Sequence, residues 1–148
     1  MTSAGTRGDE ADEGPDEPTA RVLCDTAALA AAAPTEATVA WKLTESGRQL
    51  DANVVRLTPG RHVAPHAEPD LDVLLLVVSG DGTLGTPGTP GTPGTPGTPE
   101  ADEQQPLTPG ALVWLPHGSS RSITAGDDGL AYLTVHRRRP GMQIGRPR

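Results

Sequence analysis

Aromatic residues are scarce in this chain of 148 residues, which has no phenylalanine and contains only Trp41, Trp114 and Tyr132. Proteins that bind single-stranded nucleic acids stack the bases on aromatic side chains, and this chain has too few to build such a surface. The longest run of apolar residues larger than alanine, residues 73–78, has the length of a strand. A membrane-spanning helix needs roughly 18 apolar residues. We therefore expect neither a nucleic-acid partner nor a membrane partner.

Cysteine is limited to Cys24, which excludes an internal disulfide framework and any zinc site built from several cysteines. We interpret Cys24 as a small buried apolar group, because no base that would activate its thiol is identifiable. The N-terminal segment is acidic and does not show the basic and then apolar pattern of a signal peptide. These features favour a cytoplasmic location.

Acidic residues outnumber basic ones, with 19 Asp and Glu against 12 Lys and Arg and a formal net charge of −7. The excess of acids lies in residues 1–19 and 100–103, and the remainder of the chain is close to neutral. Nothing in this remainder indicates a strongly acidic or basic partner.

Glycine and proline are abundant, at 18 and 16 residues, and many of them fall in a Gly-Thr-Pro repeat over residues 85–99. Proline blocks ladder pairing and the repeat has no apolar face, so we predict a disordered insertion over residues 85–105 within a hairpin loop. It is either a tether for a partner or a repeat expansion in a tolerant surface loop, and we favour the second.

The ends of the chain also have the composition of tails. Residues 1–20 are acidic with almost no apolar side chains, which predicts a disordered segment. Residues 21–33 are rich in alanine and end before Pro34, which predicts a short helix. Residues 137–148 contain arginines and no acids, and we interpret them as a loose basic tail.

Between these tails, short runs typical of β-strands alternate with Gly and Pro turns, which predicts an all-β sandwich or barrel over residues 21–136. Beyond Asp72, the predicted strand over residues 72–78 is apolar at both odd and even positions, as in a strand covered on both faces. Residues 79–82 and 125–129 are predicted turns. His62, Ala64, His66 and Glu68 share one parity, so a regular strand would direct all four side chains the same way.

Two segments carry a family signal. The first runs from Gly60 to Gly80 as Gly-x5-His66-x-Glu68-x3-Asp72 followed by apolar residues, and the second is Gly110-x5-Pro116-x-Gly118-x2-Arg121. In order and spacing they resemble the two sequence motifs of the cupin superfamily, most closely those of small single-domain bacterial cupins. The resemblance covers about residues 50–136 without the repeat and implies a small antiparallel jelly-roll barrel with an internal pocket.

Metal-binding cupins hold their ion with two histidines and a glutamate from the first motif and a histidine from the second. By that resemblance His66 matches the first ligand, while Glu68, Asp72 and Arg121 stand at the other three positions. Imidazole and carboxylates suit Fe, Mn, Ni or Zn, so His66, Glu68 and Asp72 are candidate ligands of a divalent metal.

Arg121 weighs against a metal, because a guanidinium keeps its proton in proteins and cannot act as a ligand. A fixed cation at the fourth position repels a metal ion and attracts carboxylates. We therefore predict an ion-paired cluster of Arg121 with Glu68 and Asp72, with the arginine in place of the metal and no cofactor.

The remaining candidates are weaker. Trp41 and Trp114 would line a pocket or pack in the core, and we favour the core. Tyr132, the other candidate pocket residue beside Trp114, would offer its hydroxyl to the interior or simply pack. His62 is expected at the barrel rim, and His117 and His136 at the surface.

Three functions remain open at this point. The first is a non-catalytic cupin barrel that binds a small organic ligand or forms a homodimer, in which Arg121 anchors a carboxylate of the ligand or is consumed by Glu68 and Asp72. The second is a metal-dependent dioxygenase or isomerase that uses His66, Glu68 and Asp72. The third is a regulatory module that acts through the acidic tail and the Gly-Thr-Pro loop. Fold alone does not decide among them.

Overall fold

Seven antiparallel strands and one short helix make up the computed structural model, which describes residues 19–32, 38–87 and 103–139. The elements are, in chain order, α2 (Thr26–Ala31), β1 (Val39–Lys42), β2 (Leu50–Leu57), β3 (His62–Ala67), β4 (Val73–Thr86), β5 (Glu103–Leu107), β6 (Leu112–Leu115) and β7 (Ser120–Arg137). The predicted all-β class with a short N-terminal helix is confirmed. No helix in these ranges has the length and apolar character needed to cross a membrane.

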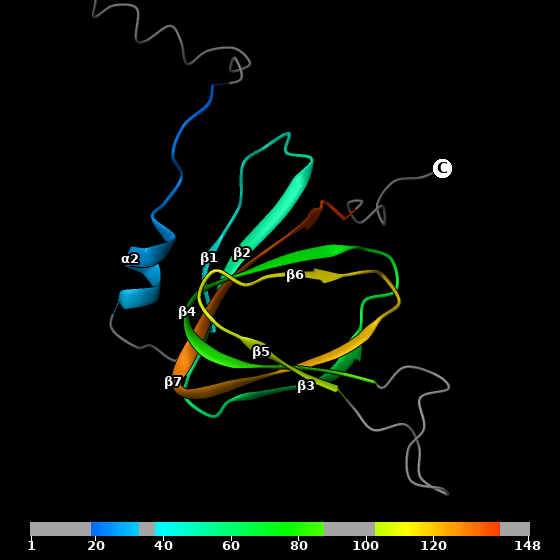
Figure 1. Cartoon of the computed structure of the whole chain (residues 1–148). Coiled ribbons are helices and arrows are strands. Elements are labelled where there is room, and N and C mark those ends of the chain that lie inside the picture. The colour runs from blue at the N-terminus through cyan, green and yellow to red at the C-terminus, as the bar shows by residue number, and fades with distance from the viewer. Residues whose placement is uncertain (1–18, 33–37, 88–102, 140–148) are drawn as a thin grey trace, which may run out of the picture.

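The long strands β4 and β7 fold the sheet into two layers (Figure 1). The first part of β4 lies between β6 and the second part of β7, and this layer continues through β2 to β1. The second part of β4 lies between β5 and the first part of β7, which also pairs with β3. The strands therefore surround an interior, and β5 and β6 are edge strands of different layers.

The predicted turns at residues 79–82 and 125–129 are wrong, because both segments lie inside continuous strands. Gly80 and Gly129 have φ angles of 81° and 79°, which glycine adopts without steric cost. A Cβ atom on Gly80 would lie 2.2 Å from the carbonyl oxygen of Gly129. The two glycine-rich segments thus lie against each other and let β4 and β7 bend together from one layer to the other.

The strands also extend beyond the predicted borders. Gly85 and Thr86 belong to β4 and pair with Gln104 and Glu103 of β5, so the ladder enters the segment predicted as an insertion. Arg137, predicted to begin the loose tail, ends β7 and pairs with Leu50. Predictions about residues 1–18, 88–102 and 140–148 fall outside the described part of the chain.

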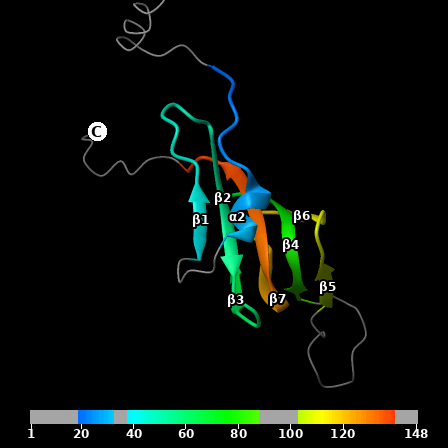
Figure 2. The same ribbon diagram turned by 90° about the vertical axis from the view of Figure 1, so that its left-hand side faces the viewer.

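The helix is shorter than predicted because Asp25 fixes its start. The Asp25 carboxylate accepts hydrogen bonds from the backbone nitrogens of Ala27 and Ala28, at 3.0 and 3.2 Å, as an N-cap residue does. The helix lies on the outer side of the sheet in front of β2 and β7 and contacts β2 and β4 (Figure 2).

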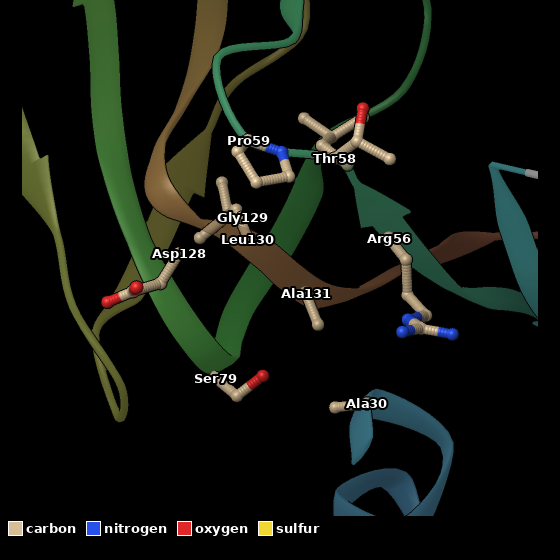
Figure 3. A pocket seen from close by; sticks show the side chains of 10 residues that line it. Ala30, Arg56, Thr58, Pro59, Ser79, Asp128, Gly129, Leu130 and Ala131 are labelled. Atoms are coloured by element: carbon tan, nitrogen blue, oxygen red, sulfur yellow. The ribbon is translucent and has the colours of Figure 1, made fainter. Parts of the chain in front are cut away.

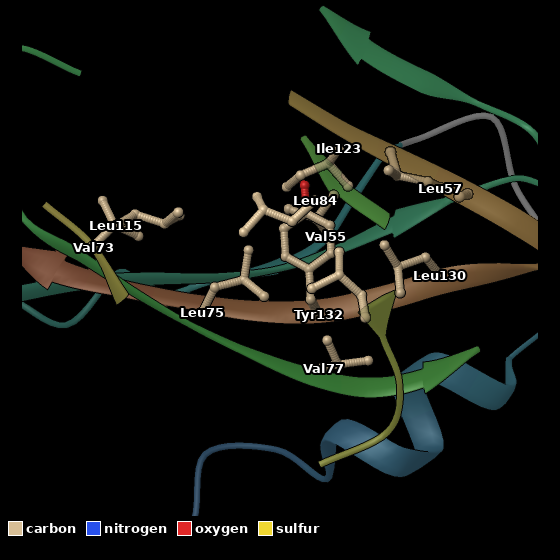
Figure 4. Packing of buried hydrophobic residues seen from close by; sticks show 12 residues of the cluster. Val55, Leu57, Val73, Leu75, Val77, Leu84, Leu115, Ile123, Leu130 and Tyr132 are labelled. Carbon is tan, nitrogen blue, oxygen red and sulfur yellow. The ribbon is translucent and has the colours of Figure 1, made fainter. Parts of the chain in front are cut away.

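The core fills the space between the two layers and consists mainly of aliphatic side chains around Tyr132 (Figure 4). Leu75, Val77 and Leu107 are each about 1% exposed. On β4 the buried residues alternate with Leu74 and Leu76, which are 43% and 37% exposed. The prediction that residues 72–78 are covered on both faces is therefore wrong within the described structure, since one face of this strand lacks a cover.

Candidate functional site

A cavity of about 400 Å³ lies beside the edge strands β5 and β6. Most of the residues that line it have apolar side chains, and Arg121 is the one charged residue among the described residues that line it. The lining residues are Leu84, Thr86, Gln105, Pro106, Leu107, Ala111, Leu112, Val113, Trp114, Leu115, Pro116, Ser119 and Arg121. A cavity of this size that combines apolar side chains with a few polar groups and one cation is typical of sites for small organic molecules.

Arg121 belongs to the inward-facing series of β7, in which Arg121, Ile123 and Ala125 are buried. It is 6% exposed, and its Nη1 atom donates a hydrogen bond to the carbonyl oxygen of Ser119 at 3.2 Å. Burial lowers the pKa of the guanidinium, and the negative charge of Glu68 partly opposes that shift. The group remains a cation, because arginine keeps its proton in proteins.

Glu68 bonds a different arginine. Its Oε1 atom lies 2.5 Å from Nη2 of Arg139, and its Oε2 atom accepts the backbone N–H of Asp70 at 2.9 Å. These bonds, with that to Arg139 first, hold the pKa of Glu68 below its usual value, and the charge of Arg121 contributes least among the causes. Glu68 is therefore neutralised at the end of the barrel.

Asp72 is bound by His117. Its Oδ1 atom accepts the backbone N–H of His117 at 2.9 Å and lies 2.7 Å from the ring nitrogen Nδ1 of the same residue. The pKa of Asp72 is lowered, mainly by the contact with the His117 ring and secondly by the hydrogen bond from the His117 backbone.

The predicted cluster of Arg121 with Glu68 and Asp72 does not form, since none of the salt bridges among the described residues involves Arg121. The physical reason is that nearer partners reach both carboxylates, from the end of β7 and from the turn after β6. Arg121 is left buried without a carboxylate partner in the described structure.

The four residues expected on one face of β3 do not share it. The register of β3 against β7 shifts between Val63 and His66, so His62 pairs with Thr124 while His66 pairs with Arg121. His62 Nδ1 lies 2.8 Å from the Thr124 hydroxyl, on the side opposite to buried Ile123. The irregularity contains Pro65, which cannot donate a ladder hydrogen bond.

The residues that would hold a metal do not fit one. Among the described residues, no three His, Cys, Asp or Glu side chains come together as a metal site would require. Asp72 and Glu68 are engaged by His117 and Arg139, and the guanidinium of Arg121 would repel a divalent ion in the cavity. We therefore assign no step to a metal.

The other candidates lie outside the cavity or only border it. Tyr132 packs in the core, and burial raises its pKa to about 12. Trp114 borders the cavity and is 58% exposed, so it does not pack in the core. Trp41, Cys24 and His136 are half-buried, and His117 is exposed.

A second hollow of about 270 Å³ lies between α2 and the outer side of the sheet (Figure 3). Arg56 and Asp128 contribute its charged groups, and Arg56 Nη2 donates to the carbonyl oxygen of Ala32 at 2.7 Å. This arginine supports the helix end, and Asp128 is exposed. The cavity at Arg121 is therefore the stronger candidate site.

Neither protein-family models nor curated proteins match the chain. Solved structures do. BH2720 from Bacillus halodurans superimposes with a TM-score of 0.55 at 14% identity, over 73% of this chain and 75% of that one. The cupin domain of Cnp3 from Schizosaccharomyces pombe gives a TM-score of 0.52 at 13% identity, over 67% of this chain and 63% of that one. The chain has the cupin fold. The jelly-roll barrel that the two sequence motifs imply is thereby confirmed.

Within this cupin barrel, the sequence did not reveal Arg139 as the partner of Glu68. The signal that was present is the run of three arginines that starts at the last residue of β7. Basic residues directly after a strand end are well placed to reach acids on neighbouring loops.

Proposed function

We propose that this cupin barrel binds a small organic molecule with a carboxylate and an apolar body, and that Arg121 anchors the carboxylate. The observation that carries the proposal is a guanidinium that is 6% exposed at the wall of the cavity and has no carboxylate partner in the described structure. A buried charge is costly unless it is paired, and an anionic ligand would supply the missing partner.

The chemistry of the wall fits such a ligand. A guanidinium presents a planar fork of N–H donors that matches the two oxygens of a carboxylate. Leu84, Leu107 and Leu115 offer aliphatic surface to the rest of the molecule, and each is buried. Thr86, Gln105 and Ser119 add polar groups that would fix its orientation.

Calorimetric titration of the full chain with octanoate and benzoate, and with octanamide and benzamide as uncharged counterparts, tests this function. A charge-assisted hydrogen bond contributes about 1.5–3 kcal/mol, so at least one acid should bind about ten- to a hundredfold more tightly than its amide. Arg121→Met should remove this preference, whereas Arg61→Met, at an exposed arginine outside the cavity, should retain it.

Equal affinity of the wild-type protein for acid and amide would refute the proposal, as would a preference that persists in Arg121→Met. Absence of binding by all four compounds at millimolar concentration would refute it as well.

A further inference from the structure

Four apolar side chains form a patch on the outer face of the sheet, across β4 and β6. Leu112 is 67% exposed and Trp114 58%, and beside them lie the half-exposed Leu74 and Leu76. Leu74 pairs with Trp114 and Leu76 pairs with Leu112, so all four side chains point to the same face. We call these four residues the β4–β6 patch. A contiguous apolar surface of this kind usually marks a site that another surface covers.

The patch is regular, because its residues fall in two rows. The pair Leu74–Trp114 forms the first row, and the pair Leu76–Leu112 forms the second row two residues further along each strand. A strand rises about 3.3 Å per residue, so the rows are about 7 Å apart. An extended segment with apolar side chains at two positions i and i+2 has the same spacing and would place one side chain on each row.

One segment outside the described residues has this pattern. Residues 140–148 directly follow the last described residue and have the sequence Pro-Gly-Met-Gln-Ile-Gly-Arg-Pro-Arg, in which Met142 and Ile144 are two positions apart. Residues 1–18, 33–37 and 88–102 contain no large apolar residue other than Met1. Among these segments, residues 140–148 are therefore the best match to the patch.

The described part of the chain ends beside the first row. Val135 of β7 pairs with Leu74, so the row continues onto the strand that leads to residues 140–148. Beyond this strand, Arg139 is hydrogen-bonded to Glu68, whose carbonyl oxygen accepts the N–H of Gly118 in the turn that follows β6. These contacts hold the chain after β7 at the end of the sheet where β4 begins and β6 ends (Figure 1).

The next two residues favour a reversal of the chain at this point. Pro140 and Gly141 suit the two central positions of a type II turn, because proline fixes its φ angle and glycine adopts the positive φ angle of the second position. A turn over residues 139–142 would send the segment back over the outer face. β7 and β6 lie about 10 Å apart, at two strand spacings, and the five residues from Arg137 to Met142 span up to about 17 Å.

We propose that residues 140–148 fold back onto the β4–β6 patch of the same chain, with Met142 on the first row and Ile144 on the second. A segment that is tethered beside its site has an effective concentration of about millimolar, which favours it over an untethered partner. The net charge of −7 opposes an anionic membrane surface as the occupant. The docked segment acts as an intrachain competitor for any partner that recognises the patch.

Methyl NMR of the full chain, labelled at methionine and isoleucine, tests this docking. The chain has two methionines, Met1 and Met142, and one of its two isoleucines is Ile144. The Met142 methyl should show a ring-current shift from Trp114 that disappears in Trp114→Leu, whereas the Met1 methyl should not move. The Ile144 methyl should show nuclear Overhauser contacts with the methyl groups of Leu112.

Quenching of tryptophan emission by acrylamide measures the cover of Trp114 in Trp41→Phe, in which Trp114 is the one remaining tryptophan. In this background, Met142→Asp/Ile144→Asp should increase the quenching and shift the emission to longer wavelength. Gln143→Asp/Gly145→Asp is the matched control, because it adds the same charge to the same segment on the side that points away from the sheet. It should leave the quenching and the emission unchanged.

The protection of Trp114 should also be independent of protein concentration, since the contact lies within one chain. The proposal is overturned if the Met142 methyl signal is the same in wild type and Trp114→Leu, or if the two double variants are quenched equally. Protection that is lost on dilution as a dimer dissociates in sedimentation would overturn it and assign the cover to a second copy. Exposed Trp114 in a wild-type protein that binds lipid vesicles would overturn it in favour of a membrane.

Discussion

Glu68 and Arg139 are hydrogen-bonded at the end of the barrel, with 2.5 Å between Oε1 and Nη2, although 71 residues separate them in the sequence. This pair neutralises the carboxylate that would otherwise compete with a ligand for Arg121. The ligand-binding proposal therefore depends on whether Glu68 pairs with Arg139 or with Arg121.

Arg139→Ala should raise the pKa of Glu68 toward its usual value, because the hydrogen bond to Arg139 is the largest cause of the lowered pKa. Arg121→Met should change this pKa less, since its charge is the smallest of the causes. Carboxyl-carbon NMR titrations of the two variants measure both shifts. A larger rise in Arg121→Met would contradict this assignment and favour an ion pair inside the barrel.

Asp72 should make the stability of the protein depend on pH. Its pKa is lower in the folded state, so its bonds to His117 stabilise the protein above the usual pKa of 3.8 and lose this effect as pH falls through the lowered value. Asp72→Ala should therefore unfold at lower urea concentration than the wild type at neutral pH, and the difference should shrink below pH 3.8.

Asp127→Ala serves as the control for that experiment, because Asp127 is exposed and makes no salt bridge to another described residue. It should show no such pH-dependent difference. If the difference in the urea concentration of unfolding between Asp72→Ala and the wild type stays constant at acidic pH, the Asp72 charge does not have this role.

Arg121→Met should leave the free energy of unfolding unchanged or raise it by up to about 2 kcal/mol. Replacing a buried charge by an apolar side chain of similar length is often neutral or stabilising. Arg121→Ala should be less stable than Arg121→Met, because it also removes the aliphatic stem of the side chain. Urea unfolding compares the three proteins, and a large loss of stability in Arg121→Met would mean that the guanidinium serves the fold.

Gly80→Ala should destabilise the barrel by at least about 3 kcal/mol, since the new Cβ atom would collide with the backbone of Gly129 in addition to the strain of a positive φ angle. Gly60→Ala separates the two effects. Gly60 has a φ angle of 78° with open space around it, so this variant should lose about 1–2 kcal/mol. Equal losses in the two variants, measured by chemical unfolding, would show that the close approach of β4 and β7 does not matter.

The sequence predicts the fold well because strand and turn signals are local. The spacing of Gly60, His66, Gly110 and Pro116 indicated the barrel. The bends at residues 79–82 and 125–129 were mistaken for turns because glycine clusters look alike in both settings. What distinguishes them here is that Gly80 lies against Gly129, a contact between segments far apart in the chain.

The site is less predictable from sequence than the fold. Arg121, which the second sequence motif singles out, lies at the cavity wall. The partners of Asp72 and Glu68, however, are His117 and Arg139, which lie far from them in the sequence and which the fold brings near them. The register shift beside Pro65 also reversed the expected facing of His62 relative to His66. Pro65 is evident from the sequence, but the sequence does not show to which face the residues after it point.

The sharing of β4 and β7 by both layers ties the layers into one unit. If one layer unfolds, the other layer loses the pairing of its central strands β4 and β7. A partly unfolded species with a single intact layer is therefore not expected to be stable. Backbone amides on opposite sides of the barrel should accordingly exchange their hydrogens with solvent through the same global opening.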